Sequence, residues 1–178
     1  MSERFGAVDK LQADLCGRPL LSHMLETVRS VGFREVFIVS QTLSAFGTRT
    51  VINKNPEAGQ GHALRLGVRA CLDAGWSRVM VVLGDMPLIG ATYLEAMIEA
   101  SENETALVSL CDGRRLPPAI FDGSALEQIL AQDSSSGARA IFDQLNPATF
   151  PLDADSAQDV DMPQDLIRVA AIMKSRST

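Results

Sequence analysis

Residues 77–89, with the sequence SRVMVVLGDMPLI, decide the fold of this chain. The run VMVVL in their middle is apolar, mostly β-branched and of strand length, which is typical of a strand covered on both faces. Gly84 and Asp85 follow it directly. In an open α/β sheet the ligand lies beyond the carboxyl ends of the strands, so Asp85 is a candidate site residue.

On both sides of this stretch, apolar strand patterns alternate with amphipathic helix patterns. Further strands are predicted at 34–40, 48–53, 105–110 and 148–152, and helices at 18–33, 61–76, 91–101, 122–132, 136–145 and 162–175. The alternation predicts an α/β fold of the Rossmann-like, three-layer type, with a mostly parallel sheet and helices on both faces. A length of 178 residues fits a single domain over 1–178.

The composition limits the class of partner. The chain carries a net charge of −6 and has no block of Lys and Arg, which argues against nucleic acid. No apolar run is long enough to span a membrane or to form a signal peptide, so we expect a cytoplasmic protein without a membrane partner. Cys16, Cys71 and Cys111 are odd in number and widely spaced, so we expect them to pack in the core.

Two aspartates are candidates for magnesium binding. Asp85 follows the central strand. Asp161 follows a strand-like segment and lies in DVDMPQDL, which repeats the Asp-Met-Pro tripeptide before the last helix. Mg²⁺ is commonly held by one or two carboxylates together with substrate phosphates. The alternatives are that Asp85 only supports a turn and that Asp161 only caps the helix.

A glycine-rich turn precedes the second helix. In NPEAGQGHALRLG, Asn55, Gly59 and Gly61 would let the backbone approach a base or sugar, beside a helix N-terminus that favours anions. His62 lies in the same turn and His23 in the first helix, but neither has a partner at a recognisable spacing. We therefore expect both histidines to have surface, capping or other structural roles.

The opening MSERFGAVDK contains the residue types that are typical of a phosphate-binding loop. Ser2, Arg4, Gly6 and Lys10 offer backbone N–H groups, a guanidinium and an ammonium group, which suit a triphosphate and a departing pyrophosphate. The alternative is a frayed, charged terminus.

Taken in order, these segments resemble the nucleotidyltransferases of molybdenum cofactor maturation, which join CTP or GTP to molybdopterin. The matching segments are SERFGAVDK, GRPLLSHMLETV, NPEAGQGHALRLGV, VMVVLGDMPLI, PPAIFDGSALEQILAQDSSSGAR and DVDMPQDL. The resemblance implies a fold of the nucleotide-diphospho-sugar transferase type and in-line attack on the α-phosphate with release of pyrophosphate.

The resemblance also implies roles for single residues and partners. It implies Mg²⁺ held by Asp85 and Asp161, with Arg4 and Lys10 on phosphates and with Lys10, Asp85 and Asp161 as the catalytic residues. The implied partners are CTP or GTP, molybdopterin, and the molybdoenzyme or its chaperone.

The chain departs from the family pattern in several places. The family's first strand and its Leu-Ala-Ala/Gly-Gly run have no counterpart, so we expect a chain that is N-terminally truncated relative to the family, with a gap in the sheet. Leu116, Pro117 and Pro118 replace a Gly-His-Pro of many cytidylyl members, and Ala63 replaces a usual Ser. Two alternatives remain: a non-catalytic, degenerate nucleotide-binding or accessory protein, and a sugar-phosphate nucleotidyltransferase.

Overall fold

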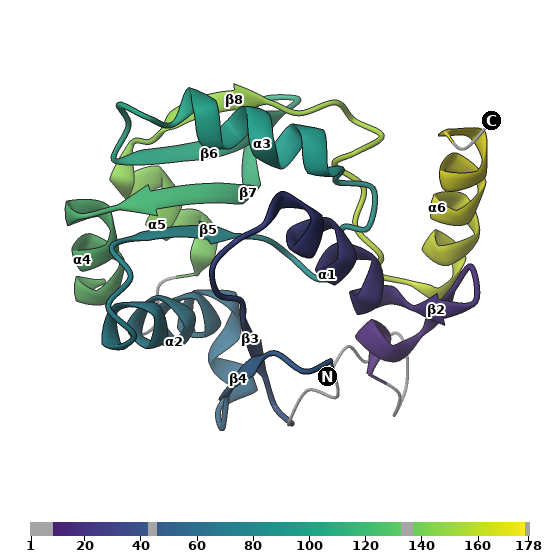
Figure 1. The fold of residues 1–178 in the computed structure, drawn as a ribbon, viewed down its shortest axis with the longest axis horizontal. Helices are drawn as coiled ribbons and strands as arrows, with labels where there is room; N and C mark the ends of the chain where they lie inside the picture. Colours follow the sequence, from purple (N-terminus) through teal and green to yellow (C-terminus); the bar gives the residue numbers. More distant parts are fainter. Residues whose placement is uncertain (1–8, 43–45, 133–136, 177–178) are drawn as a thin grey trace.

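A computed structural model describes residues 9–42, 46–132 and 137–176 of the chain (Figure 1). Its helical elements are the 3₁₀ turns η2 (Lys10–Gln12) and η3 (Pro56–Ala58) and the helices α1 (Leu20–Val31), α2 (Gly59–Asp73), α3 (Ala91–Ala100), α4 (Ser124–Ala131), α5 (Ala138–Leu145) and α6 (Pro163–Arg176). Its strands are β1 (Asp14–Leu15), β2 (Arg18–Pro19), β3 (Phe37–Ser40), β4 (Arg49–Ile52), β5 (Arg78–Val81), β6 (Ala106–Cys111), β7 (Arg114–Asp122) and β8 (Ala148–Pro151). The mixed α/β fold confirms the predicted class.

The strands form one larger sheet and two small ones. The larger sheet has the order β5-β7-β6-β8, in which β8 runs parallel to β6 while β7 runs antiparallel to both β5 and β6. β3 and β4 form a separate parallel pair, and β1 and β2 a short antiparallel one.

The central strand β7 was not among the predicted strands. Its sequence includes Pro117 and Pro118, and proline normally argues against a strand with two neighbours because it cannot donate to the ladder. The ladder with β6 shifts register between Val108 and Ser109, whose partners are Ala119 and Leu116. The two prolines therefore lie opposite the irregularity, where the regular ladder is already interrupted.

Helices cover both faces of the larger sheet, as the alternation of side chains along its strands requires. On one face, Val108, Ala119 and Phe121 pack against apolar residues of α2, α4 and α5. On the other face, Leu107 and Ile120 pack against α3, beside which α1 lies. The result is a three-layer core whose middle layer is the sheet.

The strands β3 and β5 are only half-buried, whereas β6 is buried along almost its whole length. The apolar runs VFIV and VMVVL are both typical of strands covered on two faces, and that prediction is wrong for β3 and for β5. The physical reason is a cavity of about 850 Å³ that both strands line, together with residues of α1 and α2.

A smaller apolar cluster attaches α6 to the rest of the molecule. Leu15, Leu20, Leu88, Val160 and Val169 form it, and all five side chains are buried. Since Val160 and Leu88 both belong to this cluster, the segment before α6 is held against the segment that follows β5, which is an edge strand of the larger sheet and not the central strand that the sequence predicts.

The cysteines differ from one another in burial. Cys71 and Cys111 are buried, which confirms their predicted place in the core, but Cys16 is exposed. Cys16 lies in the turn between β1 and β2, where its φ is 54°, and the prediction that it packs in the core is wrong. Within the three described ranges, no helix is both long enough and apolar enough to cross a membrane.

Candidate functional site

Lys10 lies between two carboxylates that are far apart in the sequence. Its Nζ donates to Asp85 Oδ2 at 2.6 Å and to Asp161 Oδ1 at 3.0 Å. Lys10 and Asp85 are largely buried, with exposed side-chain fractions of 20% and 14%, while that of Asp161 is 48%. The structure therefore brings together the three residues predicted to be catalytic.

Short-range interactions fix the positions of Lys10 and Asp85. Asp9 Oδ1 accepts the Leu11 N–H at 3.0 Å and so caps the turn η2 that carries Lys10. A Cβ on Gly84, directly before Asp85, would lie 2.7 Å from Leu21 Cδ1, so the end of the Leu21 side chain would have to move to make room for it. Glycine thus lets the segment leaving β5 pass close to α1.

Asp161 is held by the start of α6 and not by a strand. Asp165 Oδ2 accepts the backbone N–H groups of Asp161 at 2.9 Å and of Met162 at 2.7 Å. One residue earlier, the Val160 N–H donates to the backbone oxygen of Asp85 at 2.9 Å. The interpretation that Asp161 follows a strand-like segment is wrong, because β8 ends at Pro151 and a long loop lies between them.

The charges at the site act on one another. Burial works to lower the pKa of Lys10, but its hydrogen bonds and charge interactions with Asp85 and Asp161 outweigh it and raise that pKa above 10.5. Lys10 is therefore an ammonium ion at neutral pH. Desolvation at the cavity wall, followed by the negative charges of Asp161 and Asp85, raises the pKa of Asp159.

The donor atoms fit a hard divalent cation. Asp85 Oδ1 is buried and has no hydrogen-bond partner in the described part of the chain. The described residues contain no group of three or more His, Cys, Asp or Glu side chains that could hold a metal by themselves. Two carboxylates suit Mg²⁺ where substrate phosphates and water complete its octahedral shell.

At the glycine-rich turn, the residues that line the cavity are neighbours of the predicted nucleotide-binding residues and not those residues themselves. Gln60 and Ala63 line the same cavity as Lys10 and Asp85, whereas Asn55, Gly59 and Gly61 are not among its lining residues. Gly59 has a φ of +78°, a backbone conformation that favours glycine, while Gly61 is buried inside α2. Their assignment to nucleotide binding therefore stays a prediction, and Ser2, Arg4 and Gly6 lie outside the described residues.

Two further candidate residues were not predicted from the sequence patterns. Asp159 lines the cavity beside Asp85, and Asp165 holds the backbone of Asp161. Both belong to the motif DVDMPQDL, so its unusual density of aspartates was the available signal. The role of each depends on backbone hydrogen bonds and packing that a sequence pattern does not contain.

His23 has a structural role, as expected. It is buried, with Nε2 2.8 Å from the backbone oxygen of Leu15 and Nδ1 3.2 Å from Arg18 Nη2. It therefore ties α1 to the β1–β2 turn.

The curated relatives that the chain matches differ in length. The bifunctional protein GlmU of Clavibacter sepedonicus is 26% identical over 162 residues, which are 83% of this chain and 33% of that protein. The purine catabolism protein PucB of Bacillus subtilis is 26% identical over 190 residues, which are 95% of this chain and 92% of that protein. The chain thus spans about a third of the GlmU proteins that it matches.

Solved structures share the fold over nearly the whole chain. Rv0371c of Mycobacterium tuberculosis superposes with a TM-score of 0.78 at 18% identity, covering 96% of this chain and 92% of that one. Molybdopterin-guanine dinucleotide biosynthesis protein A of Archaeoglobus fulgidus superposes with a TM-score of 0.73 at 17% identity, covering 98% and 94%. A manganese complex of Rv0371c has a TM-score of 0.68 at 15% identity, covering 91% of each chain.

The family assignment comes from a direct match of the sequence. The family model described as the MobA-like NTP transferase domain matches residues 1–149. This range covers well over half of the chain and includes Lys10 and Asp85, and it confirms the resemblance to the nucleotidyltransferases of molybdenum cofactor maturation at the level of the family. The chain therefore belongs to the MobA-like NTP transferase domain family of nucleotidyltransferases.

Proposed function

We propose that this protein transfers the nucleotidyl group of CTP or GTP to molybdopterin and releases pyrophosphate. The observation that carries the proposal is the Lys10 ammonium bridging Asp85 and Asp161 at 2.6 and 3.0 Å. A centre that combines a fixed cation with two carboxylates is suited to binding a metal–triphosphate complex. The relatives support the acceptor class, because one structural neighbour is named for molybdopterin-guanine dinucleotide biosynthesis.

The reaction demands alignment and charge neutralisation more than a strong base. A terminal phosphate oxygen of the acceptor forms a bond to the α-phosphorus, and the bond from that phosphorus to the bridging oxygen of the β-phosphate breaks. Pyrophosphate leaves with the bonding electrons. Lys10, whose pKa is raised, stays protonated throughout and provides a positive charge for phosphate oxygens.

Asp85 and Asp161 are the residues that would hold the divalent cation, for which we propose Mg²⁺. The bound cation would neutralise phosphate charge and orient the triphosphate. The unpartnered Asp85 Oδ1 supports this role, and the manganese complex of the related Rv0371c fold is consistent with a divalent ion. Asp165 would keep Asp161 in place through the two backbone N–H groups that it accepts.

We assign the two substrates to different sides of the cavity. Gln60, between Gly59 and Gly61, and Ala63 line one side of the cavity, and we assign the nucleotide to that side together with Asn55, Gly59 and Gly61. Leu116 and Pro117 line the cavity as well, at the position where the family pattern differs, and we assign the pterin to that side. The molybdoenzyme or its chaperone would receive the product.

The test is pyrophosphate release by the purified protein with molybdopterin, Mg²⁺ and either CTP or GTP. We expect turnover with one nucleotide, and a loss of about a hundredfold or more in Asp85→Ala, by analogy with the removal of other charge-stabilising groups. Asp73→Ala is the matched control, because Asp73 is exposed at the end of α2. No turnover with either nucleotide, or equal turnover in Asp85→Ala, would contradict the proposal.

A second candidate function keeps the chemistry and changes the acceptor. The match to GlmU proteins over most of this chain favours a sugar phosphate as the alternative acceptor. The same assay with glucose 1-phosphate or glucosamine 1-phosphate in place of molybdopterin distinguishes the two. Nucleotide binding without turnover on any acceptor would instead favour a non-catalytic accessory protein.

A further inference from the structure

We propose that Ser109 and Tyr93 position the part of the cavity wall formed by Leu116 and Pro117, and that they thereby set the affinity for the acceptor substrate. Neither is among the described residues that line the cavity, so both are positioning residues and not catalytic ones. The inference rests on the proposed function, in which the acceptor lies against Leu116 and Pro117. It concerns the acceptor side of the cavity and not the nucleotide or the metal.

A chain of hydroxyl groups joins α3, β6 and β7 behind this wall. The Tyr93 hydroxyl donates to Ser109 Oγ at 2.9 Å, and Ser109 Oγ donates to the backbone oxygen of Pro118 at 2.7 Å. Burial raises the pKa of Tyr93, so its phenol is a neutral donor at neutral pH. The chain of hydrogen bonds therefore ends on the carbonyl of the residue that directly follows the wall.

Ser109 is a polar residue in a buried, mostly apolar strand. Its exposed fraction is 0%, and a hydroxyl in such a place is costly unless it is hydrogen-bonded. Met97 Sδ also lies 3.6 Å from Ser109 Oγ, but a thioether is a weak acceptor. The single hydroxyl proton of Ser109 is therefore given to Pro118, and this hydrogen bond is what the serine adds over an alanine.

The ladder between β6 and β7 does not fix the wall by itself. Ser109 pairs with Leu116, and the preceding residue Val108 pairs with Ala119. Two residues of β7, Pro117 and Pro118, therefore have no opposite residue in β6, and proline has no N–H to donate. The hydrogen bond from Ser109 holds this bulge against β6 at the point where the ladder shifts register.

The wall lies at the end of the sheet that carries Asp85. β5 and β7 run antiparallel, with Val81 opposite Ala119. The chain from Val81 to Asp85 and the chain from Ala119 back to Leu116 therefore extend toward the same end of the sheet. Leu116 and Asp85 line the same cavity.

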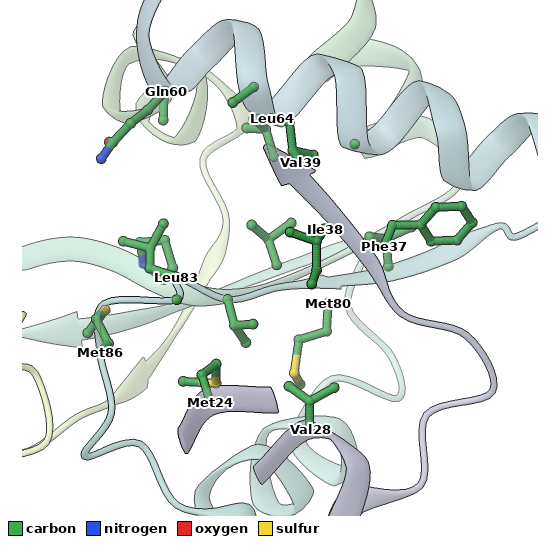
Figure 2. Close-up of a pocket in the computed structure, with 18 of the residues that line it drawn as sticks. Met24, Val28, Phe37, Ile38, Val39, Gln60, Leu64, Met80, Leu83 and Met86 are labelled. Atoms are coloured by element: carbon green, nitrogen blue, oxygen red, sulfur yellow. The ribbon is translucent and has the colours of Figure 1, made fainter. Parts of the chain in front are cut away.

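Apolar packing joins Leu116 to the segment around Asp85. Leu116 packs against the buried cluster that includes Met86, the residue after Asp85. Figure 2 shows Met86 and Leu83 on the side of the cavity that lies away from Phe37. A shift of Leu116 would therefore change the shape of the cavity beside the carboxylates, where the acceptor must be aligned with the α-phosphate.

The experiment removes the two hydroxyl groups one at a time from the full chain. Ser109→Ala removes the donor to Pro118. Tyr93→Phe removes only the hydroxyl behind it and keeps the ring, whose centroid lies 5.5 Å from that of Phe150. Tyr93→Phe therefore tests the same hydrogen-bond chain if Ser109→Ala does not fold.

Ser101→Ala is the matched control. Ser101 is also 0% exposed, and its Oγ donates to the backbone oxygen of Ile98 at 2.8 Å and accepts from Arg78 Nη2 at 2.6 Å. Arg78 begins β5, at the other end of that strand from Asp85. The control thus loses an equally buried hydroxyl at the end of the sheet that lies away from the wall.

Initial rates of pyrophosphate release give separate KM values for the acceptor, molybdopterin or glucosamine 1-phosphate, and for CTP or GTP. We expect Ser109→Ala to raise the KM for the acceptor about tenfold, the order expected when a buried carbonyl loses its donor, and Tyr93→Phe to raise it less. The KM for the nucleotide and kcat should stay unchanged, because only ground-state binding of the acceptor is weakened. Ser101→Ala should change none of these values.

Amide hydrogen exchange of residues 114–116 reports the position of the wall directly. We expect it to be about tenfold faster in Ser109→Ala than in the unaltered protein, and unchanged in Ser101→Ala.

Two results would overturn the inference while the proposed function stands. One is an unchanged KM for the acceptor in folded Ser109→Ala and Tyr93→Phe proteins. The other is an equal rise in the KM values of acceptor and nucleotide, or the same change in Ser101→Ala, which would show a general loosening of the fold.

Failure of the proposed function would give a different pattern. The unaltered protein would then release no pyrophosphate with either acceptor, and calorimetric titration of molybdopterin in the presence of Mg²⁺ and CTP or GTP takes the place of the rates. Binding about tenfold weaker in Ser109→Ala than in the unaltered protein would still support the positioning role. Equal binding by the two proteins, or no binding by either, would overturn it.

Discussion

Lys10 Nζ lies 2.6 Å from Asp85 Oδ2, across 75 residues of sequence. The contact joins the turn η2 to the segment that leaves β5, and the 3.0 Å contact with Asp161 adds the start of α6. Three parts of the chain thus converge on one ammonium group. Because Lys10 occupies the space between two carboxylates, it both neutralises them and competes with any cation that they bind.

Replacing Lys10 by Met tests this double role. We expect turnover to fall by about a hundredfold, because a charge that stabilises phosphate oxygens is lost. We expect Mn²⁺ to bind more tightly at the same time, because the carboxylates of Asp85 and Asp161 lose their competing cation. Pyrophosphate release measures the first effect, and electron paramagnetic resonance of free Mn²⁺ measures the second.

Lys54→Met is the control for that substitution, because Lys54 is exposed and lies outside the cavity lining. It should change neither quantity. Weaker Mn²⁺ binding in Lys10→Met than in the unaltered protein would show that Lys10 supports the metal site and does not compete with it.

Removing the side chain of Asp165 should loosen the start of α6. Asp165→Ala leaves the N–H groups of Asp161 and Met162 without their acceptor, and we expect a loss of about 1 kcal/mol in the free energy of unfolding, as for other helix-capping residues. Asp165→Asn keeps an acceptor oxygen and should lose less. Urea unfolding at pH 7 measures both, and equal stability of Asp165→Ala and the unaltered protein would exclude this role.

The stabilising effect of Asp165 should depend on pH in the acid range. Burial works to raise the pKa of Asp165, but the N–H groups of Met162 and Asp161 and the charge of Arg168 outweigh it and hold the pKa below 3.8. A depressed pKa in the folded state contributes stability above 3.8 that is lost as the pH falls through the folded value.

The difference in unfolding free energy between the unaltered protein and Asp165→Asn should therefore be constant near neutral pH and shrink below about pH 4. Urea unfolding of both proteins between pH 7 and pH 3 measures it. A difference that grows as the pH falls would contradict the sign of this shift.

The larger sheet and the β3–β4 pair should differ in local stability. β6 pairs with β7 on one side and β8 on the other and is buried, whereas β3 pairs, among the described residues, with β4 alone and lines the cavity. Opening of β3 therefore breaks fewer contacts, and its amides should exchange faster than those of β6. Hydrogen exchange with peptide resolution checks this, and slower exchange at residues 37–40 than at 106–111 would disprove it.

Much of the layer architecture could be predicted because it depends on local periodicity. The apolar residues of α1 recur on one helical face and Gly32 ends the helix in a left-handed conformation with a φ of 80°, as its sequence predicts. β7 could not be found in this way, because Pro117 and Pro118 are tolerated only through a register shift in the neighbouring strand β6. That accommodation is a property of the pair of strands and not of either sequence.

The candidate site, like the fold, is predictable only where a position follows from a local sequence pattern. Asp85 was predictable because its position follows from the end of a single strand. The approach of Asp161 to Lys10 depends on the burial of Val160 in a cluster with α6 and on the backbone hydrogen bond that Asp161 donates to Asp165. Both interactions join the loop before α6 to the helix itself, and a local sequence pattern does not contain them. The half-burial of β3 was unpredictable for a related reason, since it depends on what lies beside the strand and not on its own apolar residues.

The central claim is that Asp85, Asp161 and Lys10 form one centre for a metal–nucleotide complex. Calorimetric titration of CTP and of GTP into the protein, with and without Mg²⁺, tests it most directly in the unaltered chain, Asp85→Asn and the control Asp73→Asn. We predict Mg²⁺-dependent binding of at least one nucleotide that is unchanged in Asp73→Asn and weakened about tenfold or more, or 1.4 kcal/mol, in Asp85→Asn. Equal, Mg²⁺-independent affinities in all three proteins would contradict the account.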